Sequence, residues 1–212
     1  MSGIRKFSMR SQCYEIIKEK ILRGEYKLGE YINIANLSTE LEVSNTPIRE
    51  ALTQLESDGL VISTMNAKAQ VIYFTHESFR DIADTVYILV KGAYELCLKE
   101  SKLDMLLDML RKSLALQEKH LNEGDYYEYT KELVYFDQII FEVLDNPNLL
   151  FVFNRISQVL FLMYRTNHER NNWALSRSID EHRKIVQTME AGENVLLEQL
   201  IREHYHQSYV EN

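Results

Sequence analysis

The ten residues VSNTPIREAL, numbered 43 to 52, decide how the first part of this chain folds. Ser44 is of a type that caps helix N-termini, and Pro47 is tolerated in a first helical turn, where its missing N–H has no partner to lose. Gly59 marks the end of the helix. Apolar residues recur at helical spacing between these signals: Ile48, Ala51, Leu52 and Leu55. The pattern predicts a capped helix with one buried face.

The first turn of this predicted helix carries side chains suited to reading DNA. Ser44, Asn45 and Thr46 are short hydrogen-bonding groups, and Arg49 adds a guanidinium. An Arg can pair bidentately with guanine and an Asn with adenine, while a helix N-terminus favours a phosphate. The alternative is a capped helix on an ordinary protein surface. The elements around it favour DNA binding.

The segments on either side predict the rest of a small DNA-binding domain. Apolar spacing predicts helices at 9–22 and 33–41, and a short turn at 42–44 leads into the helix described above. Two β-prone runs, 60–64 and 69–74, enclose a short polar tip and predict a hairpin. Helix, helix, turn, helix and hairpin is the order of a winged helix-turn-helix.

The chain after residue 75 has the pattern of continuous helix, interrupted by short breaks that contain Gly, Pro or Asn. Six helices are predicted, at about 76–100, 102–122, 125–144, 148–168, 173–190 and 193–210. An antiparallel bundle is the economical way to pack them. We therefore expect a mostly α protein with two domains, a winged helix-turn-helix at 1–75 and an all-α antiparallel helical bundle at 76–212.

Charge is distributed unevenly between these two parts. The net charge of −8 lies entirely in residues 76–212, because residues 1–75 are neutral overall. Basic residues gather around the first predicted helix: Arg5, Lys6, Arg10, Lys18, Lys20, Arg23 and Lys27. A cationic arm of this kind suits DNA phosphates, while an acidic body stays away from them. Charge alone equally fits a solvated amphipathic helix.

Composition excludes several classes of protein. No apolar stretch reaches the length of a membrane span, and the N-terminus lacks the apolar segment of a secretory signal. The two cysteines, Cys13 and Cys97, lie far apart and fit a reducing compartment. We expect a cytoplasmic protein with no membrane partner.

The first part resembles the N-terminal domain of GntR-family transcription regulators over about residues 8–75. The resemblance rests on GEYI at 29–32, LSTEL at 37–41, TPIREAL at 46–52 and LESDGLV at 55–61. It implies a homodimer on a palindromic operator, with a recognition helix in each major groove and wings in the minor groove. It implies these DNA-binding residues: Arg10, Ser44, Asn45, Thr46, Arg49, Asn66 and Lys68. The family usually has Arg in place of Asn45 and often Gly in place of Asn66.

Three residues of the second part have the chemistry of metal ligands. Asp137, His182 and His204 fall on three different predicted helices, and such residues can converge inside a bundle. One carboxylate and two imidazoles suit Zn²⁺, Ni²⁺, Fe²⁺ or Mn²⁺. A His on an amphipathic helix is more often a surface or satisfied core residue, so spacing alone leaves both interpretations open.

Residues 76–210 resemble the FCD domain of the FadR subfamily. Metal-binding members have a D-x-x-x-H motif and two later His 22 residues apart, which this chain matches at His182 and His204. The motif's Asp falls on Leu133 and its His on Asp137, so at most three protein ligands remain. A weaker site, a site completed by effector or water, and no metal all stay open.

The resemblance also implies a small-molecule effector, commonly a carboxylate metabolite. Arg155 and Arg165 are the candidate carboxylate partners, because a guanidinium matches a carboxylate fork; surface ion pairs are the alternative. Tyr94 stands where the family often has a charged residue, so it is a further effector-binding candidate in a more apolar pocket. Aromatic residues at helical spacing, Tyr164 among them, are more often core than ligand contacts.

The function predicted is therefore that of a ligand-responsive transcription regulator, expected to be a repressor. A metal-dependent enzyme is the first alternative, but the sequence has no phosphate-binding loop, GxSxG or HExxH motif. We expect no enzyme activity. The second alternative is a helical interaction protein that does not bind DNA, which would show no salt-sensitive affinity for it.

Overall fold

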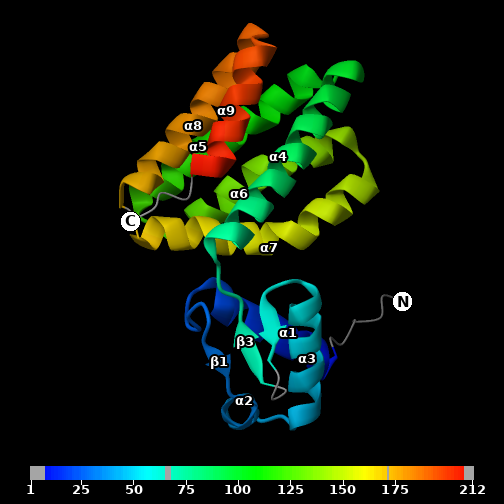
Figure 1. The fold of residues 1–212 in the computed structure, drawn as a ribbon, viewed down its shortest axis with the longest axis vertical. Helices are drawn as coiled ribbons and strands as arrows, with labels where there is room; N and C mark the ends of the chain where they lie inside the picture. The colour runs from blue at the N-terminus through cyan, green and yellow to red at the C-terminus, as the bar shows by residue number, and fades with distance from the viewer. Residues whose placement is uncertain (1–7, 65–67, 171, 208–212) are drawn as a thin grey trace, which may run out of the picture. The chain divides into compact units, whose positions relative to one another are not determined.

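The computed structural model describes residues 8–64, 68–170 and 172–207. It divides the chain into two compact units, Met1–Phe74 and Thr75–Asn212, one residue before the boundary that the sequence suggested (Figure 1). Among the described helices, none combines the length and the apolar character that crossing a lipid bilayer requires.

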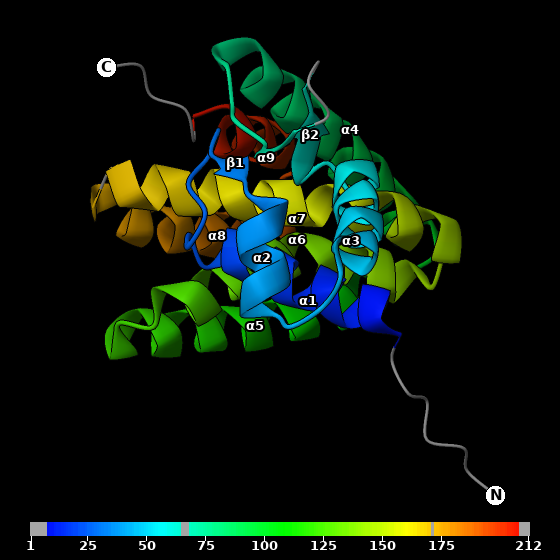
Figure 2. The ribbon, with the colours of Figure 1, turned by 90° about the horizontal axis from the view of Figure 1, so that it is seen from below.

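The helices of the first unit form where their caps and apolar spacing predict. Helix α1 (Met9–Leu22) and helix α2 (Ile34–Glu40) both pack against α3 (Asn45–Ser57) (Figure 2). The Asn33 side chain caps α2 by accepting from two backbone N–H groups, and Ser44 occupies the cap position of α3. The core of this unit consists of fully buried aliphatic residues, including Ile17, Ile21, Leu37, Ile48, Leu55, Leu60 and Val71.

A small antiparallel sheet completes the first unit. Strands β2 (Val61–Ser63) and β3 (Ala69–Val71) form the predicted hairpin. A third strand, β1 (Tyr31–Ile32), pairs with the other edge of β3, so the strand order is β1-β3-β2. The sequence did not predict β1. The winged helix-turn-helix arrangement itself is confirmed.

The second unit consists, in its described part, of six helices. They are α4 (His76–Lys99), α5 (Leu103–Glu123), α6 (Tyr126–Leu144), α7 (Pro147–Arg170), α8 (Asn172–Ala191) and α9 (Asn194–Gln207). The predicted boundaries agree with these to within two residues, except at the end of α9. Predicted residues 208–210 lie outside the described part of the chain.

Helix α6 lies inside this bundle and carries one of the functional candidates. It packs against α4, α5 and α7, and its buried residues are spread around most of its circumference. Helix α8 packs against α5, α7 and α9. A polar residue on the inner face of α6 or α8 is therefore removed from water and must find partners inside the bundle.

Candidate functional site

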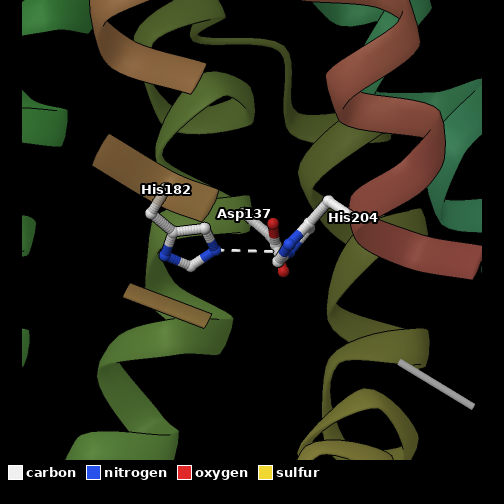
Figure 3. Close-up of side chains that lie close together, drawn as sticks. All are labelled: Asp137, His182 and His204. Carbon is white, nitrogen blue, oxygen red and sulfur yellow. Dashed lines mark hydrogen bonds between the residues drawn. The ribbon is translucent and has the colours of Figure 1, made fainter. Parts of the chain in front are cut away.

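The bundle brings Asp137, His182 and His204 together from α6, α8 and α9. All three side chains are buried, and each offers one potential ligand atom within 4.8 Å of the others. Figure 3 shows the two imidazoles turned towards each other with the carboxylate beside them, and their Nε2 atoms are 3.3 Å apart. In the described part of the chain this is the only group of three or more such residues.

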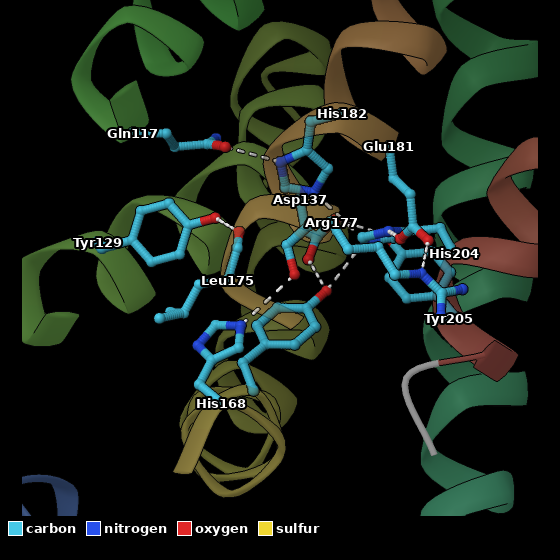
Figure 4. Close-up of polar contacts among 12 residues, drawn as sticks. Gln117, Tyr129, Asp137, His168, Leu175, Arg177, Glu181, His182, His204 and Tyr205 are labelled. Atoms are coloured by element: carbon cyan, nitrogen blue, oxygen red, sulfur yellow. Dashed lines mark hydrogen bonds and ion pairs between the residues drawn. The ribbon is translucent and has the colours of Figure 1, made fainter. Parts of the chain in front are cut away.

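Each imidazole is held by a partner at its outer nitrogen. His182 Nδ1 lies 2.9 Å from Gln117 Oε1, and His204 Nδ1 lies 2.8 Å from Glu181 Oε2 (Figure 4). When each Nδ1–H donates to its acceptor, each Nε2 is left with a lone pair, and the two lone pairs face one another. This is the way in which proteins orient histidines that bind metals.

Two tyrosine hydroxyls complete the surroundings of Asp137. Tyr164 Oη donates to Asp137 Oδ2 at 2.9 Å, and Tyr205 Oη donates to Asp137 Oδ1 at 2.5 Å. Burial raises the pKa of the Asp137 carboxyl, although His204 and both hydroxyls act in the opposite direction. Burial and the neighbouring His204 hold the pKa of His182 well below its usual range, so its imidazole is neutral.

The donor set of this cluster fits a divalent metal. Two neutral imidazoles and one carboxylate are typical ligands, and both imidazoles have outer-shell partners. Glu181 is suited to this role, because its bonds to His204 and Arg177 lower its carboxyl pKa against the upward effect of burial. Leu133, one turn before Asp137, is a fully buried aliphatic residue and supplies no ligand. The described part of α6 therefore contributes one ligand rather than two.

Two hollows lie beside the cluster. One, of about 400 Å³, lies between α8 and α9; it is lined by Ser176, Arg177, Asp180, Glu181, Lys184, Leu200, Glu203 and His204. The other, of about 30 Å³, is mostly apolar, with Asp137 and Tyr205 in its wall. The first is large enough for a small metabolite and reaches His204, whereas the second has room for about one water.

The predicted effector-binding residues lie elsewhere. Arg155 is exposed on α7, and Arg165, also on α7, pairs with Glu169 at 3.2 Å. Tyr94 is buried on α4 and donates to Asn194 Oδ1 at 3.2 Å. None of these three residues lines either of the two hollows described above.

Sequence reasoning missed the residues that surround the metal candidates. Glu181 directly precedes His182, and Tyr205 directly follows His204, so both were adjacent to predicted ligands. Gln117 and Tyr164 lie on α5 and α7 and gave no local signal. The one sequence pattern that could have pointed to Gln117 is a polar residue within an otherwise apolar helical stripe.

The DNA-reading candidates form an exposed group at the start of α3. Ser44, Asn45, Thr46 and Arg49 are all exposed, and the Ser44 side chain makes no capping hydrogen bond. Two further candidates lie outside α3. Arg10 on α1 donates to Gln54 of α3 at 3.0 Å, and Lys68 lies 5.8 Å from the centre of the Tyr31 ring. Asn66 lies outside the described residues.

Comparison with known proteins finds two family models along the chain. The family described as "Bacterial regulatory proteins, gntR family" matches residues 9–67, and the FCD domain matches residues 92–207. The transcriptional regulator YdhC of Bacillus subtilis (strain 168) is 25% identical over 195 residues, 92% of this chain and 86% of that protein. The gluconate operon transcriptional repressor of the same strain is 23% identical and covers 91% and 80%.

A solved structure has the same fold. A GntR-type regulator from Rhodococcus sp. RHA1, described as putative, superposes with a TM-score of 0.74, covering 95% of this chain and 96% of that one. Its sequence is 15% identical to the present chain. At this identity the likeness supports the fold alone.

Proposed function

Since this chain belongs to the GntR family of bacterial regulatory proteins and carries an FCD domain, it is a ligand-responsive DNA-binding transcription regulator rather than an enzyme, and we propose that it represses transcription as a homodimer on a palindromic operator. The observation that carries this proposal is the pairing of an exposed base-reading turn on α3 with a buried Asp–His–His cluster in the bundle. Such a protein acts on chromosomal DNA, so we place it in the bacterial cytoplasm.

DNA binding rests on the first turn of α3. Asn45 and Arg49 are exposed and can pair with base edges. Arg10 and Lys68 are cations suited to contacts with phosphates. Two such helices, one per protomer, would read half-sites about one helical turn apart. The family usually has Arg where this chain has Asn45, so we expect a different base preference at that position.

Dimerisation is proposed to use the second unit. Helices α4 and α7 pack against each other and expose large apolar residues, notably Ile88 at 65% and Phe151 at 62%. Exposed apolar side chains of this size often mark a protein interface, and a two-fold axis would bury both copies at once.

The effector is proposed to bind between α8 and α9, in the hollow of about 400 Å³. Its lining offers Arg177 and Lys184 as cations and Ser176 as a hydroxyl, next to the carboxylates of Asp180, Glu181 and Glu203. This mixture suits a small hydroxylated acid better than an apolar molecule. The gluconate operon repressor among the relatives supports the same class of compound.

A divalent metal is proposed as part of this site. Asp137, His182 and His204 would hold it, and when bound it would supply positive charge for an acidic group of the effector. Gln117 and Glu181 hold the outer nitrogens of the two imidazoles and so orient them. His204 belongs both to the cluster and to the lining of the hollow, which links the two.

Regulation requires that the effector bind two states of the dimer with different affinity. Contacts on α8 and α9 would alter the packing of the bundle and thereby the spacing or mobility of the two recognition helices. The test is operator binding, followed by fluorescence anisotropy, with hydroxylated acids such as gluconate added in turn. Operator affinity that is the same with and without every acid that binds the protein would contradict the proposal.

A further inference from the structure

Tyr164 stands in contact with two of the three metal candidates. It lies on α7 and is 4% exposed. Its hydroxyl oxygen is 2.9 Å from Asp137 Oδ2 and 3.3 Å from His204 Nε2. It therefore reaches the inner side of the cluster, the side on which the two imidazole Nε2 atoms meet.

These separations are those of atoms that share one cation. Bonds of about 2.0–2.2 Å in tetrahedral or octahedral geometry place neighbouring ligand atoms about 2.8–3.6 Å apart. The two Nε2 atoms are 3.3 Å apart, and Tyr164 Oη is 3.3 Å from one of them. Its 2.9 Å separation from Asp137 Oδ2 is at the short end of the same range. No side chain must move far for all four residues to face one ion.

We propose that Tyr164 is a fourth ligand of this site, which completes the set Asp137, Tyr164, His182 and His204. The inference rests on the proposed metal site and adds its fourth ligand. A phenolate is an anionic oxygen donor that proteins use as a metal ligand. Leu133 offers no competing ligand from α6.

Tyr205 has a different role. Its hydroxyl donates at 2.5 Å to Oδ1, the carboxylate oxygen that Tyr164 does not contact, and its ring lies edge-on to His204 with centroids 4.9 Å apart. Tyr205 is therefore a positioning residue that orients Asp137, whereas Tyr164 is a ligand. On metal binding, Tyr164 Oη would bond to the ion and release its proton to solvent, with no electron transferred.

The two tyrosines make a matched pair for the test. Ferric iron serves as the spectroscopic probe for a bound phenolate: metal-free protein is titrated with ferric nitrilotriacetate, and visible absorption is recorded. We expect a charge-transfer band from phenolate to iron in the wild type, absent from Tyr164→Phe and retained by Tyr205→Phe. Zn²⁺ binding, measured by competition with a chromogenic chelator, should persist in Tyr164→Phe, because Asp137 and both imidazoles remain.

Other outcomes overturn the inference. A band that survives in Tyr164→Phe, or a wild type that binds Zn²⁺ and shows no band with ferric iron, excludes Tyr164 as a ligand and leaves the three-residue metal site standing. A wild type that binds neither metal removes the proposed metal site as well. If Tyr164→Phe does not fold, resonance Raman spectra of the iron-loaded wild type decide, because ring vibrations of a bound tyrosinate must appear.

Discussion

Single side chains determine how the two imidazoles of the buried cluster are oriented. Glu181 and Gln117 come from α8 and α5, and each holds the outer nitrogen of one imidazole. These two side chains thereby fix the inner nitrogens on one point. The affinity of the site for metal is thus set partly by residues that do not touch the metal.

Replacing Glu181 with Gln should weaken metal binding. The variant keeps an acceptor for His204 Nδ1–H but loses the negative charge that makes the imidazole a better donor. We expect a loss of about 10–100-fold in Zn²⁺ affinity, measured by isothermal titration calorimetry. Glu190 lies further along α8 and pairs with Arg111 of α5. Glu190→Gln is the matched control and should leave the Zn²⁺ affinity unaltered. An equal loss in both variants would contradict the role given to Glu181.

His168 should make the protein less stable in acid. Burial lowers its pKa from the usual 6.5 to about 4. Between these values the unfolded chain binds a proton at this residue and the folded protein does not, so stability falls as pH falls from 6.5 towards 4. The loss reaches about 3 kcal/mol at the acid end.

Urea denaturation at several pH values measures this effect. In His168→Gln the free energy of unfolding should decline less steeply between pH 6.5 and 4 than in the wild type. An unchanged slope in His168→Gln would show that other groups cause the acid sensitivity.

At the scale of elements, α3 is the reading helix. Arg49 is exposed near its N-terminal end, and its replacement by Ala should cost about 1–3 kcal/mol of specific binding, about 5–150-fold in operator affinity. Fluorescence anisotropy with operator and with unrelated DNA separates specific from non-specific binding. Arg111→Ala, on α5 of the other unit, is the control. Full affinity in Arg49→Ala would mean that another element reads the bases.

Asn45 should set the base preference of the same helix. Replacement by Arg, the residue usual in the family at this position, should shift the selected base from adenine towards guanine. Selection of binding sites from randomised duplexes, compared between Asn45→Arg and wild type, measures the shift. Identical selected sequences would place Asn45 away from the bases.

Local patterns predicted the elements well and their partners poorly. Caps and apolar spacing located α3 and the six helices of the bundle, because these signals act over a few residues. Strand β1 has two residues and exists through its pairing with β3, about forty positions later, so no local signal announces it. For the same reason Asp137, His182 and His204 were predicted by residue type and family spacing, whereas Gln117 and Tyr164 depend on how helices pack.

At the scale of the whole molecule, DNA binding should depend on association. Ile88→Glu combined with Phe151→Glu places charge on the proposed interface of α4 and α7, so it should give monomers in sedimentation experiments and weaken operator binding. Val195 on α9 is 89% exposed, and Val195→Glu is the matched control that should remain dimeric. A double variant that stays dimeric would require a different interface.

Glu181 and His182 are neighbours in sequence yet serve different helices, since Glu181 bonds to His204 on α9 and His182 to Gln117 on α5. One turn of α8 therefore connects α5 and α9 through side-chain hydrogen bonds rather than through the backbone. Opening any of these helices breaks the bonds of the others, so they should behave as one cooperative unit. In hydrogen–deuterium exchange, metal would then slow the amides around Gln117, His182 and His204 by a common factor, and this shared protection would extend to segments that no ligand touches.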